Sequence, residues 1–474
     1  MKASRACRGY ECNASILYEI QNTQSYSHLS AARKCSLPLR VSIPGTNLFP
    51  EDAIPLERSE EESNWLSFRA FLYDFCVTST NSDLSRGYLH DVEALVGRLG
   101  PASDLVKACQ AVSFSCHGKV LRRPNLVYKS ERLYQEVLGS FAKTINDPIL
   151  ANTTESKLVA LLLGLYQIAA TTESSYGEHL IHANGLAALL KIGQSPLSLL
   201  GTMGSPLIQG VGIKQNIGVF SASAFSNYGE SLESILLQLS SVWNKSEAVL
   251  EMEEVHALKN EITALDGRFI NWQKSRIQEI QPTTIGHVEE RQHVEKVQVG
   301  FWPGKIDTYF DFCVAGMWNV FRAARLLLTL LGVKLCDATG DIDGYAEYKT
   351  IANEIAKDIA ASIAFHLTDN LHVFVNELET SSEIREQGRL LGGVLLMHPL
   401  YVATQVPYLQ EELREYMRSC LEWIGSEMGL GQATLLAKVR EIDARFAYPI
   451  IVSWLTCIEC RTQSLTDAFW KVVV

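Results

Sequence analysis

Apolar residues recur at helical spacing along most of the chain after about residue 63. The first clear stripe contains five residues three or four positions apart: Trp65, Phe68, Phe71, Leu72 and Phe75. Such a stripe faces one side of an α-helix, whereas a half-buried strand alternates apolar and polar positions. Strict alternation is rare here. The pattern therefore predicts an all-α fold, a large multi-helix array of antiparallel helices with long irregular loops.

Three further helices are expected before residue 193. Ser130–Ile145 carries its apolar residues on one stripe. Asn152, with Glu155 three positions later, resembles a capping box in front of the apolar residues 157–170. The next helical pattern covers Tyr176–Ile192, and the short connections between these helices favour antiparallel packing.

Three segments interrupt the helical pattern and suggest the domain organisation. Residues 1–62 are polar and of mixed charge, so we expect a flexible N-terminal arm or linker. Residues 193–230 are rich in Gly and Ser and predict an irregular insert, and residues 281–304 predict a second loop. The rest of residues 63–474 is expected to form one helical region.

The most regular apolar stripe predicts a helix at Tyr309–Leu331, with Trp318 beside the stripe. Asn319, Arg322 and Arg325 are expected on other faces of this helix. An arginine in such a place is usually solvated or in a salt bridge, and only sometimes contacts a ligand.

The segment Gly392–Val439 is the most informative part of the chain. It has an apolar run that we expect to stop at Pro399, then a turn at Val406–Pro407. Two amphipathic helices follow, separated by Gly429–Leu430–Gly431. The segment contains no catalytic constellation, which favours an interaction surface over an enzyme.

Composition and charge limit the partners. The chain has 474 residues, of which 47% are hydrophobic and 20% charged, with a formal net charge of −11. An acidic chain does not neutralise phosphates over a broad face, and no basic module is visible, so we expect no specific DNA binding by this chain. The longest apolar runs, such as Leu158–Ala170, are too short to span a bilayer.

The cysteines and the N-terminus indicate the compartment. Eleven cysteines are irregularly spaced, which is typical of reduced, mostly buried thiols in the cytosol or nucleus. The first fifteen residues have no continuous apolar core of a secretory signal. We therefore expect an intracellular protein without a membrane-spanning segment.

Cys7 and Cys12 are the strongest metal signal in the chain. Two thiolates beside basic residues resemble part of a zinc site, but tetrahedral zinc needs four ligands. The only other nearby thiol is Cys35, and His28 has no suitable spacing. We expect no independent zinc site here.

Residues 339–344 resemble the start of a calcium loop, because Asp341 and Asp343 take ligand positions before Gly344. The first and twelfth places, however, are threonines, at positions 339 and 350. An ordinary turn before a helix at Tyr345–His366 is the better interpretation.

No other pattern predicts catalysis or cofactor binding. Cys457 and Cys460 form a lone C-x-x-C in an apolar segment with no βαβ pattern before it, so we expect helix cysteines. His179 and His182 are three apart, whereas two histidines facing one zinc in a metalloprotease helix are four apart. Phosphate-binding, nucleophile-elbow, dinucleotide and aspartate-rich motifs are absent from the sequence. We assign no catalytic, cofactor-binding or metal-binding residue.

Four ordered blocks resemble the fungal specific transcription factor domain, the helical region of fungal binuclear zinc cluster regulators. The blocks are Ser79–Tyr88, the His182-x-x-Gly185-x-x-x-Leu189-Leu190 pattern, the Trp318-Asn319-x-x-Arg322-x-x-Arg325 pattern, and Gly392–Lys438. The resemblance covers roughly residues 65 to 450. It implies a transcriptional regulator of the nucleus. Its helical domain would bind an effector or partners of the transcription machinery, or would self-associate.

The N-terminus departs from this family. Such regulators usually begin with six cysteines that bind two zinc ions among basic residues, and here only Cys7 and Cys12 resemble the tail of that cluster. Zinc is expected only if a complete cluster lies upstream of this chain. Either the recorded chain is truncated, or the protein regulates without its own DNA reader. A helical scaffold or small-molecule-binding protein outside transcription is the alternative hypothesis.

Overall fold

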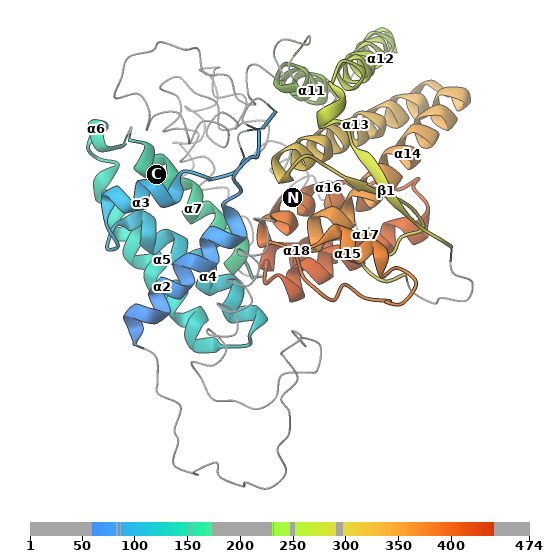
Figure 1. Cartoon of the computed structure of the whole chain (residues 1–474). Coiled ribbons are helices and arrows are strands. Elements are labelled where there is room, and N and C mark those ends of the chain that lie inside the picture. Colours follow the sequence, from blue (N-terminus) through green and yellow to red (C-terminus); the bar gives the residue numbers. More distant parts are fainter. Residues whose placement is uncertain are drawn as a thin grey trace, which may run out of the picture.

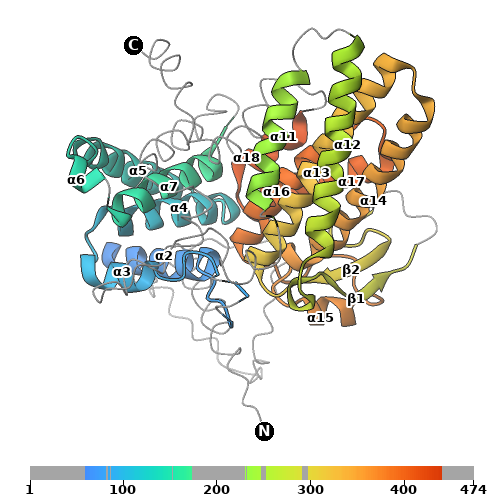
Figure 2. The same cartoon turned by 90° about the horizontal axis from the view of Figure 1, so that it is seen from above.

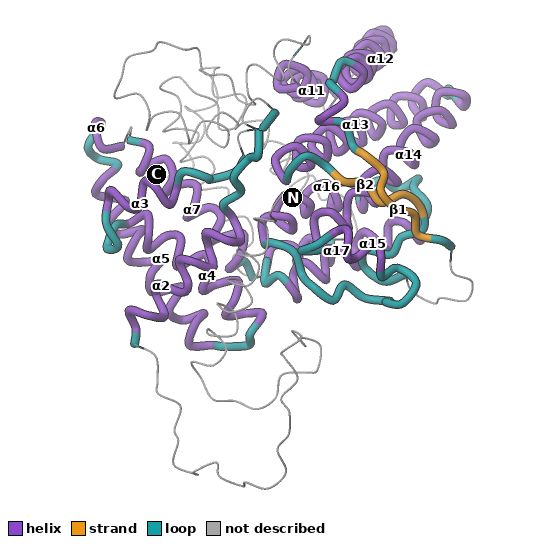
Figure 3. Tube along the Cα trace, viewed as in Figure 1, coloured by secondary structure: helices purple, strands orange, loops and turns teal. Residues whose placement is uncertain are grey.

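The computed structural model describes residues 59–172, 230–246, 252–290 and 297–439, except positions 82, 83, 86, 152 and 231. Within these ranges the chain is predominantly helical, with one two-stranded sheet (Figure 3), so the all-α prediction is confirmed. The helix expected at Tyr176–Ile192 and nearly all of the expected insert lie outside the described residues. So does most of the expected arm.

One lobe, here called the N-terminal lobe, contains the helices α2 to α7 (Figure 2). Their bounds are α2 Glu60–Phe75, α3 Val92–Leu99, α4 Asp104–Val120, α5 Pro124–Thr144, α6 Pro148–Ala151 and α7 Thr154–Ala170. Helix α4 lies at the centre, in contact with α2, α5 and α7. Most of its side chains are buried, and many of these are small, which lets three neighbours approach it closely.

The second lobe, here called the C-terminal lobe, contains the helices α11 to α18 and both strands (Figure 1). The helices are α11 Leu232–Ser246, α12 Met252–Lys274, α13 Phe312–Thr339, α14 Ile342–Leu367, α15 Leu371–Asn376, α16 Leu390–Thr404, α17 Glu411–Glu427 and α18 Gly431–Lys438. Helix α13 packs against α11, α12, α14 and α16. It is long and apolar enough to cross a membrane by composition, but its apolar window is 83% buried inside the fold. It is therefore the central core helix of this lobe.

The ends of several helices differ from the prediction because local caps decide them. Helix α13 begins at Phe312, after Asp311, whose carboxylate accepts a hydrogen bond from the Val314 N–H at 2.9 Å. It runs past Leu331 to Thr339, where Gly340 takes a left-handed conformation with φ 68°. Helix α7 is capped by Thr153, whose hydroxyl accepts from the Ser156 N–H at 3.2 Å, and not by Asn152.

The prediction that the helix stops at Pro399 is wrong. Helix α16 contains this proline in its interior and continues to Thr404. Proline removes one backbone hydrogen bond, but the helix is apolar all round and nearly fully buried. Gly392 and Gly393 let it approach closely, since an added Cβ would lie within 3.0 Å of the His366 carbonyl oxygen and the Met428 sulfur, respectively. Tight packing on its neighbours keeps the helix intact across the proline.

Residues 281–304, expected to be a loop, contain the strand β1, Thr283–Val288. It pairs antiparallel with β2, Gly304–Thr308, with an irregularity between Thr284 and Gly286. Strand β2 contacts α14. Val288 and Ile306 belong to a small second apolar cluster with Phe301, Ala364 and Phe374. The strand pair is thus stabilised by side chains from distant parts of the chain, which no local pattern indicates.

One continuous hydrophobic cluster includes buried residues of both lobes, from Leu66 in α2 to Ala437 in α18. Trp318 is 1% exposed at its centre and donates its indole N–H to the Ile280 carbonyl at 2.7 Å. Trp423 is partly buried against the same cluster. The described lobes therefore share a core, and a disturbance of one is expected to reach the other.

Candidate functional site

A buried carboxylate joins three helices where the lobes meet. Asp74 of α2 is 5% exposed, and its carboxylate lies 2.9 Å from Nε2 of His117 in α4. Its other oxygen accepts from the Leu390 N–H at 3.5 Å, at the first turn of α16. A negative charge at a helix N-terminus is favourable, because unpaired N–H groups and the helix dipole point at it. Asp74 therefore fixes the start of α16 against the N-terminal lobe.

A second polar group of the junction lies beside this carboxylate. The Tyr73 hydroxyl donates to the carboxylate of Asp369, and burial raises the pKa of both side chains. The guanidinium of Arg389 lies 4.6 Å from the centre of the Tyr73 ring and donates to the Cys76 carbonyl at 3.3 Å. These contacts tie α2 to the residues on either side of α15 and to the start of α16.

Close backbone packing at the turn between α17 and α18 also contributes to this junction. Gly429 has φ 71°, and a Cβ there would lie within 3.0 Å of the Cys116 carbonyl oxygen. A Cβ on Gly431 would also lie within 3.0 Å of the Thr171 carbonyl oxygen and of the Lys119 ammonium group. The glycine turn between α17 and α18 thus lies directly on the ends of α4 and α7. We call Tyr73, Asp74, His117, Asp369, Arg389, Leu390, Gly429 and Gly431 the lobe junction.

The block Ser79–Tyr88 forms a closed turn at the edge of this junction. Val77 and Tyr88 exchange backbone hydrogen bonds of 2.7 and 2.8 Å. Gly87, with φ 72°, lies so near that a Cβ would collide with the Val77 carbonyl. Burial raises the pKa of Asp311, and the nearby Ser85 side chain opposes this shift. The turn therefore reaches the cap of α13 in the other lobe.

Asn319, Arg322 and Arg325 were expected on faces of α13 other than the apolar stripe, and the structure shows that two of them are buried. Asn319 is 0% and Arg322 4% exposed. The Asn319 amide contacts the Ser362 hydroxyl and His366 Nε2, both at 3.0 Å. Arg322 donates to the Asn319 side-chain oxygen at 2.9 Å and to the Tyr309 hydroxyl at 2.7 Å. Buried polar groups need partners, and here each partner comes from a neighbouring turn or helix.

Burial also determines the protonation state of His366 in this network. Desolvation lowers the pKa of His366 to about 3, so its imidazole is neutral at physiological pH. Arg325, by contrast, forms a bidentate pair with Asp266 of α12 at 2.8 and 3.0 Å, so the expected salt bridge is confirmed for this arginine. The block that contains Trp318 is a core structure that joins α12, α13 and α14.

The candidate calcium loop at residues 339–344 has a structural role. Asp341 caps α14 by accepting from the Gly344 N–H at 2.9 Å, and its hydrogen bond with Lys259 lowers its pKa. This is the expected turn, although the helix begins three residues earlier than predicted, at Ile342. Across the described residues, no group of three His, Cys, Asp or Glu side chains is arranged to hold a metal ion.

The cysteines that the structure describes are free thiols, and four of them are buried. Burial raises the pKa of Cys420, for example, to about 12, so it is an unreactive core thiol. The tested cysteines agree with the prediction of reduced, mostly buried thiols. Cys7, Cys12, Cys35, His28, His179, His182, Cys457 and Cys460 lie outside the described residues.

Sequence reasoning missed most of the lobe junction. Asp74, His117 and Asp369 lie in helices or loops without a recognisable motif, and only the tertiary fold brings them together. The two junction glycines were visible in the sequence as a helix break. Their close approach to α4 and α7 was not.

The chain is similar over most of its length to a curated fungal protein. It is 41% identical over 415 residues to the protein named "Transcription factor dbaG" of Emericella nidulans, which covers 85% of this chain and 99% of that relative. No family model matches the chain. No solved structure matches it either.

Proposed function

We propose that this chain, which belongs to the family of the fungal transcription factor dbaG, regulates transcription through its helical region. The observation that carries the proposal is the extent of the similarity, which covers 85% of this chain and 99% of the relative. The helical scaffold outside transcription has no comparable support.

The helical region is proposed to act by binding an effector or a protein partner, or by self-association. Support comes from the lobe junction, where two carboxylates, one tyrosine and two glycines contribute to holding the lobes together. A ligand that binds one lobe arrangement better than another shifts the equilibrium between them. A junction made of few polar contacts over a shared core is suited to such a shift.

The 474 residues are proposed not to read DNA sequence by themselves. Their net charge of −11 opposes the phosphate backbone, whose neutralisation supplies most of the affinity of DNA-binding proteins. The protein is proposed to act in the nucleus, where its partners in transcription lie. Zinc is proposed to be needed only if a complete cysteine cluster precedes these residues.

A tethering experiment tests the regulatory role. The chain is fused to an unrelated DNA-binding module and expressed in fungal cells with a reporter that carries the module's site. We expect reporter output to change at least several-fold relative to the module alone. The matched variants are Gly431→Ala, at the junction, and Gly97→Ala, where no atom lies within 4 Å of the added methyl group.

The outcomes separate the hypotheses. Loss of the effect in Gly431→Ala, with equal protein levels and a normal Gly97→Ala, supports regulation through the joined lobes. An unchanged reporter with the unmodified chain contradicts a transcriptional role. Sequence-specific binding of the purified, unfused chain to genomic DNA fragments at physiological salt would contradict the proposal that it lacks a DNA reader.

A further inference from the structure

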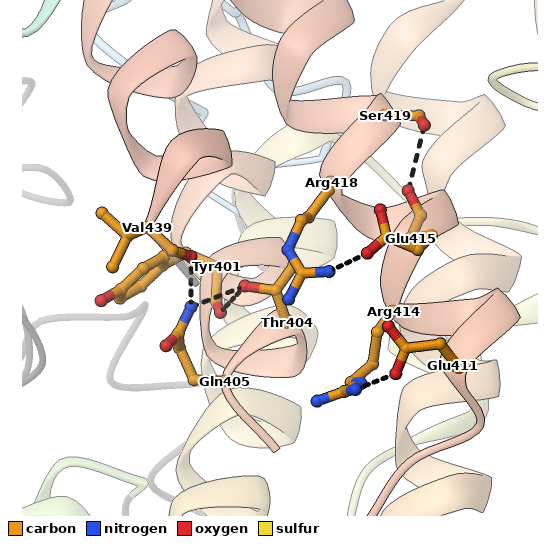
Figure 4. A network of polar contacts seen from close by, with 9 residues as sticks. All are labelled: Tyr401, Thr404, Gln405, Glu411, Arg414, Glu415, Arg418, Ser419 and Val439. Atoms are coloured by element: carbon orange, nitrogen blue, oxygen red, sulfur yellow. Dashed lines mark hydrogen bonds and ion pairs between the residues drawn. The ribbon is translucent and has the colours of Figure 1, made fainter. Parts of the chain in front are cut away.

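Two arginines of α17 lie on one face of this helix. Arg414 and Arg418 are four residues apart, so their side chains are neighbours. Figure 4 shows both guanidinium groups on the same side of α17, toward the C-terminal end of α16 where Thr404 lies. The Arg418 side chain is 7% exposed and the Arg414 side chain 19%. Neither residue belongs to the lobe junction.

Each arginine has one acidic partner, and that partner is exposed. Arg414 pairs with Glu411 and Arg418 with Glu415, each three residues earlier in α17. The glutamate side chains are 58% and 48% exposed, so both can be solvated without the arginines. Solvent at the glutamates screens these pairs and reduces what they contribute to stability.

The arginines retain unused hydrogen-bonding capacity. The Nε atoms of both are buried, and in the described part of the chain neither has a hydrogen-bond partner. Buried donors are rarely left unpaired in folded proteins. The NH2 group of the nearby Gln405 amide donates to the Thr404 hydroxyl at 3.0 Å and to the Val439 carbonyl at 3.3 Å (Figure 4), and among the described residues the buried Gln405 oxygen has no hydrogen-bond partner.

The two positive charges also oppose each other. Burial, and next the charge of Arg418, lower the pKa of Arg414. In the structure the charges of Glu411 and Glu415 balance those of the two arginines. A single anion between the two guanidinium groups relieves this repulsion and accepts hydrogen bonds from both.

We propose that Arg414 and Arg418 form a binding site for a small oxyanion, a phosphate or carboxylate group of an effector molecule. Guanidinium groups match the geometry of both oxyanions and bind them with charge-assisted hydrogen bonds. The anion takes the place of Glu411 and Glu415, which turn to solvent. This inference rests on the proposed regulatory function, because it names the chemistry of the effector.

The position of the site links it to the lobe junction. Helix α16 has 15 residues, about 22 Å at 1.5 Å per residue. Its first turn is held by Asp74, and its last turn lies beside Arg414 and Arg418. A rigid buried helix thus connects the anion site with the contact between the lobes.

Binding is tested on the purified full chain with inorganic phosphate and with citrate as probes. Isothermal titration and thermal unfolding are carried out at constant ionic strength, with sodium chloride as the reference salt. We expect at least one probe to bind and to raise Tm above the chloride value. Phosphate without citrate indicates a phosphorylated effector, and citrate without phosphate indicates a carboxylic acid.

Two variants of opposite effect assign the binding to the arginines. Arg418→Met should weaken binding at least tenfold, whereas Arg132→Met, which removes an exposed arginine paired with Glu60, should not. The double variant Glu411→Gln/Glu415→Gln removes the competing carboxylates and should tighten binding several-fold. Its side chains are exposed, so it remains informative if Arg418→Met fails to fold.

Equal binding by the wild type, Arg418→Met and the double glutamine variant would overturn the proposal. So would the absence of any effect beyond chloride. In both cases the arginines serve only to neutralise the C-terminal end of α16. The binding measurements do not depend on the reporter experiment. A failure of the anion site is therefore distinguishable from a failure of the proposed role in transcription.

Discussion

A methyl group added at the glycine turn between α17 and α18 should weaken the contact between the two lobes. At Gly429 the φ of 71° disfavours any side chain by about 1–2 kcal/mol. The new Cβ would also lie within 3.0 Å of the Cys116 carbonyl oxygen, and such overpacking costs about 1–3 kcal/mol. At Gly431 only the second cost applies, from the Thr171 and Ala169 carbonyl oxygens and Lys119. We therefore expect Gly429→Ala to be the more destabilising, by about 2–5 kcal/mol.

The assay compares these variants with Gly97→Ala, whose added methyl group has no neighbour within 4 Å and lies within α3. Alanine is favoured over glycine inside a helix by about 1 kcal/mol, so this control should be neutral or stabilising. Thermal unfolding should show a lower Tm for both turn variants. Hydrogen exchange should locate the loss of protection at the ends of α4 and α7. Turn variants as stable as the control, or a loss of protection confined to α17 and α18, would refute the role of the turn in joining the lobes.

Three further predictions concern buried polar groups. Asp74→Ala should destabilise the protein by about 2–3 kcal/mol in urea unfolding, because His117 and the N–H of Leu390 lose their acceptor; Asp74→Asn, which keeps an acceptor, should cost less. His366 has a folded pKa of about 3, below its unfolded value near 6.5, so the unfolded state binds the proton first. Stability should therefore fall as pH drops from about 6.5 toward 3, by about 2 kcal/mol at pH 5, and His366→Asn should flatten this dependence in urea titrations at several pH values. Trp318→Phe removes the donor to the Ile280 carbonyl and should cost about 1–3 kcal/mol; an unchanged unfolding midpoint would contradict this.

The helical elements could be predicted because their signals are local. The 3.6-residue period of apolar positions identified α2, α5, α7, α13 and α17. The glycines at 429–431 marked the break between α17 and α18 for the same reason. Helix ends were less accurate, since a cap depends on one side chain reaching one N–H, as Asp311 and Thr153 show.

Polar residues were harder to place, because their burial depends on partners from distant segments. Asn319 and Arg322 lie off the apolar stripe in the sequence, and the structure buries them in the core with Tyr309, Ser362 and His366 as partners. Arg414 and Arg418 are four residues apart, which places them on one face of α17, and Arg418 is buried in the fold.

The sequence by itself determined the all-α class, the helix break at the glycine turn and the resemblance to fungal transcription factors, because periodicity and motif spacing are properties of neighbouring residues. Tertiary structure alone decided that α16 continues through Pro399, that residues 283–308 include a strand pair, and that Asp74 meets α16. Each of these features depends on contacts between residues far apart in the chain. The free energy of such contacts exceeds the local conformational preferences that a sequence pattern reports, such as the tendency of proline to end a helix.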